Sequence, residues 1–486
     1  MIYDYIVIGS GLGGLSAGLN LAEKKKKVLM LEKNTLPGGL TTTFKRGRFE
    51  FDTMTDDLYN YGDGEHVGDL QNVFRKFGID IDARVIPFNT RIKVLASKED
   101  YEVKGKFEEF ILLLEEMNEG SVEPIKEFFK VIKEVHDALK EVENGNTNLA
   151  EVYPNFYKYL DVNAIKAMED MKLPKNTIHR LSYFWVEMGS PLNKLSFIDF
   201  AEFMYKLVFK KSVVLNNKSL DLMIKLVKKY QNKGGKLFYN SNVVEIRNEE
   251  GLKIVVTSDG IEYEAKHVVC NVSKRYVLKH LMKDGLKEAN RIENARTVAP
   301  AGITVYLGLN ADYRTIGLNN HRYFEFDNLN SEINIKSMQK LEHDTFRVVV
   351  PNVVNENVSP QGTTIMILKT DYYADVLKDV TEDKKLDLAQ NLIQKFEEAF
   401  DIQITPYIEE VYVATSYDVM EYANSNGGYM RLGYDNSINR LLADDEEQIP
   451  GLSFVGAASI FGGGFDNAFY SGLYVTNKLL SKEEGN

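Results

Sequence analysis

Three glycines near the start of the chain have the spacing that holds a phosphate group. Gly9, Gly11 and Gly14 follow one another as G-x-G-x-x-G, directly after the short apolar run Ile6–Ile8. The first glycine permits a tight turn, the second lets the backbone approach a pyrophosphate, and the third lets the following helix pack on the strand. Glu32 follows Gly14 at close to the ~20 residues expected of a carboxylate that hydrogen-bonds ribose hydroxyls. The pattern predicts that this part of the chain binds a dinucleotide.

A second pair of glycines, Gly38 and Gly39, comes soon after the predicted ribose carboxylate. A plain NAD-binding unit needs only a third strand here, whereas adjacent glycines let a flat or anionic group pass close to the backbone. This favours a longer cofactor such as FAD, which extends past its pyrophosphate. The alternative, an ordinary loop with two glycines, stays open on this stretch alone.

A third glycine-rich turn lies near the end of the chain. The predicted strand Gly451–Ala458 is followed by Gly462–Gly464, which opens a helix from Phe465 onward. A glycine-rich turn at a helix N-terminus binds anions, and its N–H groups could stabilise negative charge on the pyrimidine edge of a reduced flavin. The alternative is a plain strand–helix turn in a sheet.

The sequence offers little for other kinds of chemistry. Cys270 is the one cysteine, which excludes a disulfide framework and a cysteine-rich metal or iron–sulfur site. The seven histidines are scattered without H-x-x-x-H pairing, so no metal site is expected. The chain has 59 Lys and Arg against 71 Asp and Glu, and this net charge of −12 disfavours nucleic acid as the main partner.

The length and the hydropathy pattern place the protein among soluble multidomain chains. At 486 residues the sequence is too long for one ordinary core and predicts two or three domains. The N-terminus enters a strand without a signal-peptide pattern, and no apolar run approaches the ~18 residues of a spanning helix. These features predict a cytoplasmic location and leave contact with a membrane surface open.

Apolar periodicity predicts the elements that position the glycine motifs. A helix over Leu12–Ala22 and a strand over Val28–Leu31 complete the N-terminal unit. Residues 68–214 predict helices, with apolar faces over Phe107–Met117 and Ile125–Val142. A helix and strands of an α/β unit return after residue 220, with an Asp-Gly hairpin signal. The strands expected there are Lys236–Tyr239, Val243–Ile246, Leu252–Thr257, Ile261–Ala265 and His267–Cys270.

The apolar and aromatic stretch Phe197–Lys211 ends in lysines. It could cover a hydrophobic site, touch a bilayer surface, or form a core helix. Further strands predict a mixed α+β domain beside the helical segment. They are expected at Thr304–Leu309, Arg347–Val350, Thr363–Leu368 and Val411–Thr415.

The stretches Tyr3–Asp52, Val243–Ser273 and Phe454–Phe465 carry a family pattern. Together they resemble the FAD-dependent phytoene desaturase and retinol saturase superfamily, which is related to the flavin amine oxidases. The resemblance implies that the main chain around Val244 holds the adenine and that the C-terminal stretch lies beneath the isoalloxazine ring. The cofactor-binding residues expected are Gly9, Ser10, Gly11, Gly13, Gly14, Glu32, Lys33, Gly38, Gly39, Leu40, Val244, Gly456, Gly464, Phe465 and Asp466.

Two departures from that superfamily's pattern bear on the substrate. Many members continue after Phe51 and Asp52 as F-D-x-G-x-H, and here Asp56 stands where the histidine would be. Asp56 is predicted to be a catalytic, proton-handling group close to the flavin; the alternative is a structural or solvated loop residue. The glycine-rich turn that usually precedes the mid-chain helix is replaced by Leu215–Ser219.

The expected fold class is α/β: a glutathione-reductase-like, Rossmann-type FAD-binding domain with an inserted α+β substrate domain. The FAD-binding domain would be discontinuous, with residues 1–67, 216–296 and 446–486. The substrate domain would comprise residues 68–215 and 297–445. The active site would then lie in the cleft between the two domains.

The resemblance implies an FAD-dependent oxidoreductase acting on carbon–carbon bonds, by desaturation, saturation or isomerisation. Its substrate would be hydrophobic and unsaturated, such as a polyisoprenoid, a retinoid-like polyene or a fatty acyl chain, and NADH or NADPH is a candidate electron donor. One alternative is a flavin amine oxidase, for which Tyr417, Tyr422 and Tyr470 are available as an aromatic cage. The others are an FAD-containing non-redox isomerase or hydratase and a catalytically silent lipid-binding flavoprotein. Peripheral membrane contact and the oligomeric state are left open.

Overall fold

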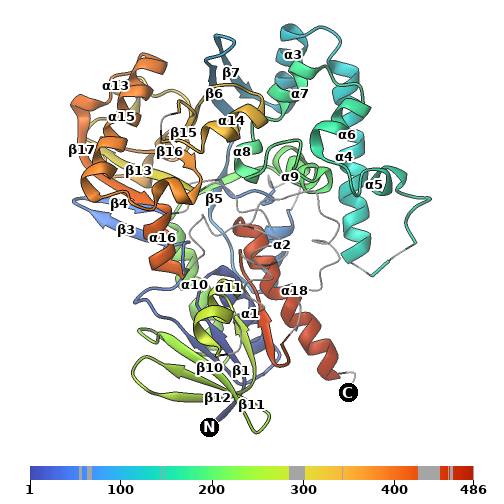
Figure 1. Ribbon diagram of the computed structural model, residues 1–486, viewed down its shortest axis with the longest axis vertical. Helices are drawn as coiled ribbons and strands as arrows, with labels where there is room; N and C mark the ends of the chain where they lie inside the picture. The colour runs from blue at the N-terminus through green and yellow to red at the C-terminus, as the bar shows by residue number, and fades with distance from the viewer. Residues whose placement is uncertain are drawn as a thin grey trace.

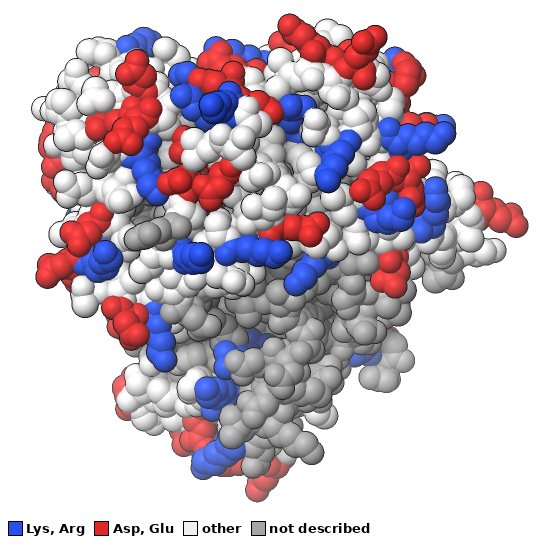
Figure 2. Space-filling view, turned by 45° about the horizontal axis from the view of Figure 1, so that its top comes forward, with Lys and Arg blue, Asp and Glu red and all other residues white. Residues whose placement is uncertain are grey.

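The computed structural model describes residues 1–53, 57–62, 68–143, 145–146, 148–283, 301–341, 343–424, 449–457, 459 and 463–484. Two seven-stranded sheets organise these residues, with a group of helices beside the second sheet (Figure 1). Among the described residues, no helix combines the length and the apolar character needed to cross a bilayer. Figure 2 shows Lys and Arg interspersed with Asp and Glu over the upper part of the molecule.

The first sheet has the order β10-β11-β12-β1-β2-β9, and β18 also pairs with β12. Strands β9, β2, β1, β12 and β18 run parallel, while β10, β11 and the start of β12 form an antiparallel meander. The strands are β1 (Ile2–Ile8), β2 (Val28–Leu31), β9 (Lys236–Phe238), β10 (Val243–Glu249), β11 (Leu252–Thr257), β12 (Glu262–Cys270) and β18 (Leu452–Phe454). The helices that pack on them are α1 (Leu12–Glu23), α10 (Ser219–Asn232) and α18 (Phe465–Glu484).

The central strands are apolar because both of their faces are covered. Ile6, Val7, Leu29 and Met30 have no exposed surface, which is typical of a parallel sheet with helices on its faces. The strand–helix–strand unit predicted for the N-terminus is confirmed. The two strands predicted within residues 261–270 form the single strand β12, because the polar residues near its start lie in the antiparallel meander and tolerate exposure.

The second sheet has the order β17-β13-β16-β15-β14-β6-β7 and is antiparallel except between β14 and β6. Helix α15 (Glu382–Phe400) covers one face of it, where Phe396 and Phe400 contact Tyr323. The strands are β6 (Phe88–Val94), β7 (Glu99–Gly105), β13 (Ala301–Leu309), β14 (Arg322–Phe326), β15 (Phe346–Val349), β16 (Thr364–Tyr372) and β17 (Ile408–Thr415).

Part of this sheet lies in a segment that was predicted to be helical, and that prediction is wrong. It expected residues 68–214 to be helical, but β6 and β7 form a hairpin there and join the sheet through β14, which was also not expected. The segments assigned to each expected domain do supply the strands of one sheet. The exact division into two domains stays a prediction.

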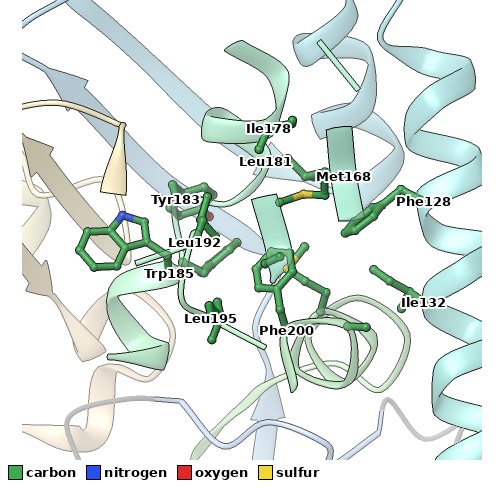
Figure 3. Close-up of a cluster of buried hydrophobic side chains, with 14 of the residues drawn as sticks. Phe128, Ile132, Met168, Ile178, Leu181, Tyr183, Trp185, Leu192, Leu195 and Phe200 are labelled. Carbon is green, nitrogen blue, oxygen red and sulfur yellow. The ribbon is translucent and has the colours of Figure 1, made fainter. Parts of the chain in front are cut away.

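The helical segment has a large apolar core, part of which Figure 3 shows. Phe128 and Ile132 of α4 meet Met168 of α6 and Phe200 of α9 in this cluster. Most apolar residues of α9 are buried in this core, which supports the core-helix alternative for this stretch. Phe203 and Lys206 of the same helix line the large cavity of the molecule, which agrees with the alternative that the stretch covers a site. The helices are α2 (Asp69–Lys76), α3 (Phe107–Met117), α4 (Val122–Glu143), α5 (Pro154–Lys158), α6 (Ala164–Asp170), α7 (Lys175–Leu181), α8 (Trp185–Met188) and α9 (Phe197–Phe209).

Shorter elements connect these layers. The hairpin of β3 (Thr43–Arg46) and β4 (Phe49–Asp52) packs Phe49 and Phe51 against Tyr306 of the second sheet, so the N-terminal segment reaches across to that sheet. The remaining strands and helices are β5 (Ala83–Val85), β8 (Val213–Leu215), α11 (Lys274–Tyr276), α13 (Tyr313–Ile316), α14 (Ser331–Ser337) and α16 (Ser416–Ala423).

Glu325 on β14 makes the stability of this sheet depend on pH. Its side chain is 4% exposed, and its Oε2 has no hydrogen-bond partner among the described residues. Burial, and then Asp344 nearby, raises the pKa of Glu325 to about 7. The folded state therefore holds the proton more tightly than the unfolded chain, and its stability falls as the pH rises from about 4.5 to about 7.

A Glu325→Gln variant removes this titration. The wild type should lose about 2 kcal/mol more than the variant between pH 5 and pH 8, after allowance for solvent screening. Thermal unfolding at both pH values measures the difference. Glu108→Gln, at an exposed glutamate, should behave as the wild type; an equal pH response of all three proteins would contradict the assignment.

Candidate functional site

A cavity of about 1970 Å³ brings the predicted motifs together with one face of the second sheet. Ligand pockets commonly measure about 300–1,000 Å³, so this cavity has room for a dinucleotide and a further molecule. Predicted residues on its wall are Gly9, Gly11, Gly13, Glu32, Lys33, Gly38, Gly39, Leu40, Gly456, Gly464, Phe465 and Asp466. Ser10, Gly14 and Val244 lie outside the lining, and Asp56 lies outside the described residues.

The first glycine turn presents the N-terminus of α1 to the cavity. Gly11 is the N-cap of α1, and no side chain caps the helix or places an acid in its first turn. Its first N–H groups and the helix dipole are thus available to an anion. Gly14 packs the helix instead, because a Cβ there would lie within 3.0 Å of the carbonyl oxygen of Gly9.

Asn271, at the end of β12, was missed as a site residue. Its backbone N–H donates to the carbonyl of Ile8 (2.8 Å). Its side-chain amide fills the space between Gly11, Gly13 and Gly456, and a Cβ on Gly11 would lie 2.6 Å from the Asn271 nitrogen. The amide therefore ties the N-terminal turn to the C-terminal segment. These residues are far apart in the sequence, so no local pattern predicts that Asn271 contacts the two segments.

Glu32 is held in place at the end of β2. Its Oε2 accepts hydrogen bonds from the backbone N–H (2.7 Å) and the hydroxyl (2.6 Å) of Ser10, and its Oε1 accepts from the N–H of Asn34 (2.9 Å). Ser10 therefore positions Glu32 and does not itself line the cavity. Lys33 beside it donates to the carbonyl of Glu421 (2.7 Å), and burial lowers the pKa of Lys33.

The second glycine pair closes against the first turn. Gly38 forms a parallel bridge with Gly11, and its N–H donates to the carbonyl of Ser10 (2.9 Å). Gly38 and Gly39 have φ angles of 106° and 59°, in the left-handed region that favours glycine. The pair therefore belongs to the wall of the cavity.

The C-terminal turn contributes a second helix N-terminus to the cavity. Gly464 has a φ of 110°, and α18 starts at the next residue. The carboxylate of Asp466 pairs with the ammonium of Lys206 from α9 (2.9 Å). In the middle stretch, Val243 lines the cavity while the side chain of Val244 is 43% exposed. Successive side chains of a strand point to opposite faces, which accounts for the difference, and the register shifts between Val243 and Glu245. The contact of the Val244 main chain with adenine stays a prediction.

The unusual segment before α10 has a structural role. Lys218 donates to the carbonyls of Glu50 and Val358, both at 2.7 Å, and burial lowers the pKa of Lys218. The N–H and hydroxyl of Ser219 donate to Asp52, at 2.7 and 2.6 Å. These contacts fasten α10 to the β3–β4 hairpin, so the departure from the superfamily pattern does not itself reach the cavity.

The second sheet contributes a wall with aromatic and charged side chains. Tyr306 and Tyr412 of this sheet contact Phe44 of the β3–β4 hairpin, with ring centroids 5.0 and 4.8 Å from that of Phe44. All three line the cavity, and none was predicted. Of the tyrosines proposed for an amine cage, Tyr422 and Tyr470 line the cavity, whereas Tyr417 packs in the core beside α15.

A buried network of charges lies at the same wall. Asp57 pairs with Arg322 and contacts the Nε2 of His321 (3.0 Å). Arg322 also bonds to the hydroxyl of Tyr59 (3.2 Å), which donates to Glu187 (2.5 Å). Asp57, Tyr59 and Glu187 line the cavity. Asp57, which follows the predicted catalytic residue Asp56 in the sequence, is therefore a structural carboxylate on the cavity wall.

Comparison with known proteins agrees with this geometry. Prolycopene isomerase 2 of an Oncidium hybrid cultivar is 25% identical over 390 residues, which cover 76% of this chain and 64% of the isomerase. The 4,4'-diapolycopene oxygenase of a Methylomonas species is 23% identical and is covered over 98% of both chains. The chain thus spans a little under two thirds of the isomerase.

The fold has solved counterparts. Cyclohexylamine oxidase from Brevibacterium oxydans superposes with a TM-score of 0.65 over the full length of both chains, at 12% identity. An identity this low shows the fold alone, and it confirms the predicted fold class. Residues 12–480 match the family described as flavin containing amine oxidoreductase. The predicted kinship is thereby confirmed: the chain belongs to the flavin containing amine oxidoreductase family.

Proposed function

We propose that the protein binds FAD and uses it to act on carbon–carbon bonds of a hydrophobic, unsaturated substrate. The main observation that supports this proposal is a cavity lined by both the glycine turns and the aromatic residues of the second sheet. Polyene chemistry is favoured by the relatives, which are named as a prolycopene isomerase and a diapolycopene oxygenase. The reaction would be a desaturation, a saturation or an isomerisation, with NADH or NADPH as candidate electron donor.

The residues present fit FAD. The α1 N-terminus faces the cavity from Gly11 and suits the pyrophosphate, and Glu32 suits the adenosine ribose hydroxyls. Gly13 lets the first turn pack closely against Gly456, because a Cβ on Gly13 would lie 2.6 Å from the Cα of Gly456. The group supplies hydride transfer at the flavin ring when bound. The N-terminus of α18, after Gly464, would stabilise negative charge on that ring, because Lys206 neutralises Asp466 in the first turn of this helix.

The protein's own contribution is to bind, to orient and to exclude water. Phe44, Tyr306 and Tyr412 offer an apolar surface on which an unsaturated chain can lie. Such a pocket keeps water from the reacting carbons. Asp56 stays a predicted catalytic, proton-handling residue. A cytoplasmic location and contact with a membrane surface also stay predictions.

Amine oxidation is the second candidate. It is favoured by the family to which the chain belongs and by Tyr422 and Tyr470 on the cavity wall. Production of peroxide on addition of amines would support this candidate.

The purified protein's visible absorption spectrum, recorded without oxygen, tests the proposal. A flavin band is expected, and addition of NADH or NADPH and then of polyenes such as carotenes and retinol separates the reactions. Bleaching by the nicotinamide followed by reoxidation with a polyene indicates a saturase, and bleaching by the polyene alone indicates a desaturase. Changed polyene geometry without net redox indicates an isomerase. No flavin after reconstitution with FAD, or no change in any polyene, would reject the proposal.

Glu32→Ala should weaken FAD binding. The variant removes the carboxylate proposed to bind the ribose and costs about 2 kcal/mol, or roughly 30-fold in Kd. Titration of the flavin-free protein with FAD, followed by quenching of FAD fluorescence, measures the change. Glu23→Ala at the far end of α1, where Glu23 pairs with Lys233 on the surface, should bind FAD as the wild type does. Equal Kd values for both variants would remove Glu32 from the site.

A further inference from the structure

The hydroxyl of Tyr59 lies between a buried base and a buried cation. It donates a hydrogen bond to Oε2 of Glu187 on α8 (2.5 Å) and accepts one from Nη2 of Arg322 on β14 (3.2 Å). Glu187 is 9% exposed and Arg322 is 6% exposed, so water screens their charges little. A phenol in this position can exchange its proton with the carboxylate, because the guanidinium stabilises negative charge on either oxygen.

A chain of contacts links Tyr59 to the start of α18. The Tyr59 ring packs edge-on against Phe203 of α9, with ring centroids 5.4 Å apart. Lys206 lies one turn further along α9 and pairs with Asp466 in the first turn of α18 (2.9 Å). These four residues and Glu187 all line the cavity. The flavin ring is proposed to lie at the N-terminus of α18, so Tyr59 borders the space that the reacting carbons would occupy.

Each of the proposed reactions needs a group that exchanges a proton with the substrate. Desaturation removes a hydride from one carbon and a proton from its neighbour, and saturation returns both. Isomerisation by way of a protonated polyene takes up a proton and releases it again. The hydride is exchanged with the proposed flavin. The proton requires an acid or base of the protein within hydrogen-bond reach of the carbon.

We propose that Tyr59 is the catalytic acid–base group and that Glu187 exchanges the proton with it. In the direction of desaturation, a C–H bond of the substrate breaks and its proton goes to the Tyr59 oxygen. The electron pair of that bond forms the new π bond as the hydride leaves the adjacent carbon for the flavin. The original proton of the phenol passes to Oε2 of Glu187, and saturation reverses each transfer. This inference rests on the proposed function and assigns its proton transfer to a described residue.

The charges behind Tyr59 hold the guanidinium in place. Asp57 pairs with Arg322, and Oδ1 of Asp57 lies 3.0 Å from Nε2 of His321. His321 is 1% exposed, and its Nδ1 lies 3.2 Å from the carbonyl oxygen of Val350. Arg322, Asp57 and His321 act through Tyr59 and not on the substrate, so they are positioning residues.

A Tyr59→Phe variant keeps the ring and removes the proton. With a polyene that the wild type converts, kcat should fall about 100-fold or more while KM changes less than about threefold, and FAD content should stay at the wild-type level. Tyr61→Phe is the matched control and should keep full kcat. The hydroxyl of Tyr61 donates to the carbonyl of Ile81 (2.6 Å), and Tyr61 is not among the described residues that line the cavity. Unchanged kcat in Tyr59→Phe overturns the inference and leaves Asp56 as the predicted proton-handling residue.

A fluorinated tyrosine in place of Tyr59 separates an acid–base role from a structural one. It has almost the size of tyrosine but is the stronger acid, so the alkaline limb of the pH profile of kcat should move to lower pH. The same replacement at Tyr61 should leave the profile unchanged. In the flavin-free protein, Glu187→Gln should make the fluorine resonance titrate at lower pH, because it removes a neighbouring negative charge. An unshifted profile or an unchanged titration overturns the assignment, and both readouts serve if Tyr59→Phe does not fold.

Failure of this inference is distinguishable from failure of the proposed function. FAD content and conversion of polyenes are measured on the wild type in the same experiments. A wild type that converts a polyene no faster than Tyr59→Phe does would overturn the role of Tyr59 alone. A wild type that holds FAD but changes no polyene would reject the proposed reaction, and the fluorine titration of the flavin-free protein would still test the pairing of Tyr59 with Glu187.

Discussion

A Gly14→Ala variant is expected to fold poorly and to lose its flavin. The new methyl group would lie within 3.0 Å of the carbonyl oxygen of Gly9, and neither backbone can move without displacing α1 from β1. Overpacking of this kind costs about 3 kcal/mol or more. Because the same shift turns the α1 N-terminus away from the proposed pyrophosphate site, flavin retention should fall with stability. The ratio of flavin to protein absorbance and the thermal midpoint measure the two effects.

Gly251→Ala is the control for Gly14→Ala. Gly251 lies in the turn between β10 and β11, where a Cβ would meet nothing within 4 Å, although its φ is 84°. The cost is then only the left-handed backbone conformation, about 1 kcal/mol. This variant should keep its flavin. If Gly14→Ala is as stable as Gly251→Ala and retains as much flavin, the packing argument is wrong.

The second large effect is expected at the buried charges around Asp57. Asp57→Asn leaves the guanidinium of Arg322, which is 6% exposed, without its carboxylate partner at that position. Breaking one side of a buried ion pair costs about 3–5 kcal/mol. Glu187 lies 3.7 Å from Arg322 and softens the loss, so about 3 kcal/mol is the expected value. Denaturant or thermal unfolding of the flavin-loaded protein measures it.

Two comparisons separate this effect from a general sensitivity to substitution. Asp100→Asn breaks the more exposed pair with Arg91 (2.9 Å) and should cost at most about 1 kcal/mol. The double variant Asp57→Leu with Arg322→Met removes both charges and should be more stable than the sum of its single changes implies. Strict additivity would show that the two side chains do not interact in the folded protein.

The N-terminal unit was predictable because its signals are local. An apolar run, three spaced glycines and an apolar helix face predict β1, α1 and β2 within a few residues. The strands of the meander were predicted for the same reason, since alternation and an Asp-Gly turn lie within one short stretch. In each case the residues that determine the element are adjacent in the sequence.

The hairpin of β6 and β7 shows where local signals were overlooked. Thr90, Ile92 and Val94 are buried at every second position, as are Tyr101 and Val103, and this alternation predicts strands. The residues that follow have a strong helical pattern, and the prediction of helices was extended from them to the whole segment. The pairing of β6 with β14 joins residues more than two hundred positions apart, and no local pattern indicates such a partner.

The candidate site was also predictable only in part. The glycines and Glu32 were found from their spacing, because the phosphate and the ribose dictate that spacing. Asn271, Tyr306 and Tyr412 were not found, because the fold alone brings them to the cavity. Their residue types are common in any strand, so chemistry could be assigned to them only after the strand register was known.

The first sheet contains residues from both ends of the chain, and this has a consequence for biosynthesis. Strand β18 pairs with the last three residues of β12, Val268–Cys270, and starts at Leu452. At roughly 5–20 residues per second, a ribosome needs on the order of ten seconds or more to reach β18 after it completes β12. Until then the C-terminal half of β12 is an open edge that other chains can pair with. A fragment that ends before residue 452 leaves this edge unpaired and is therefore expected to aggregate more readily than the full chain, which light scattering of the two purified proteins would measure.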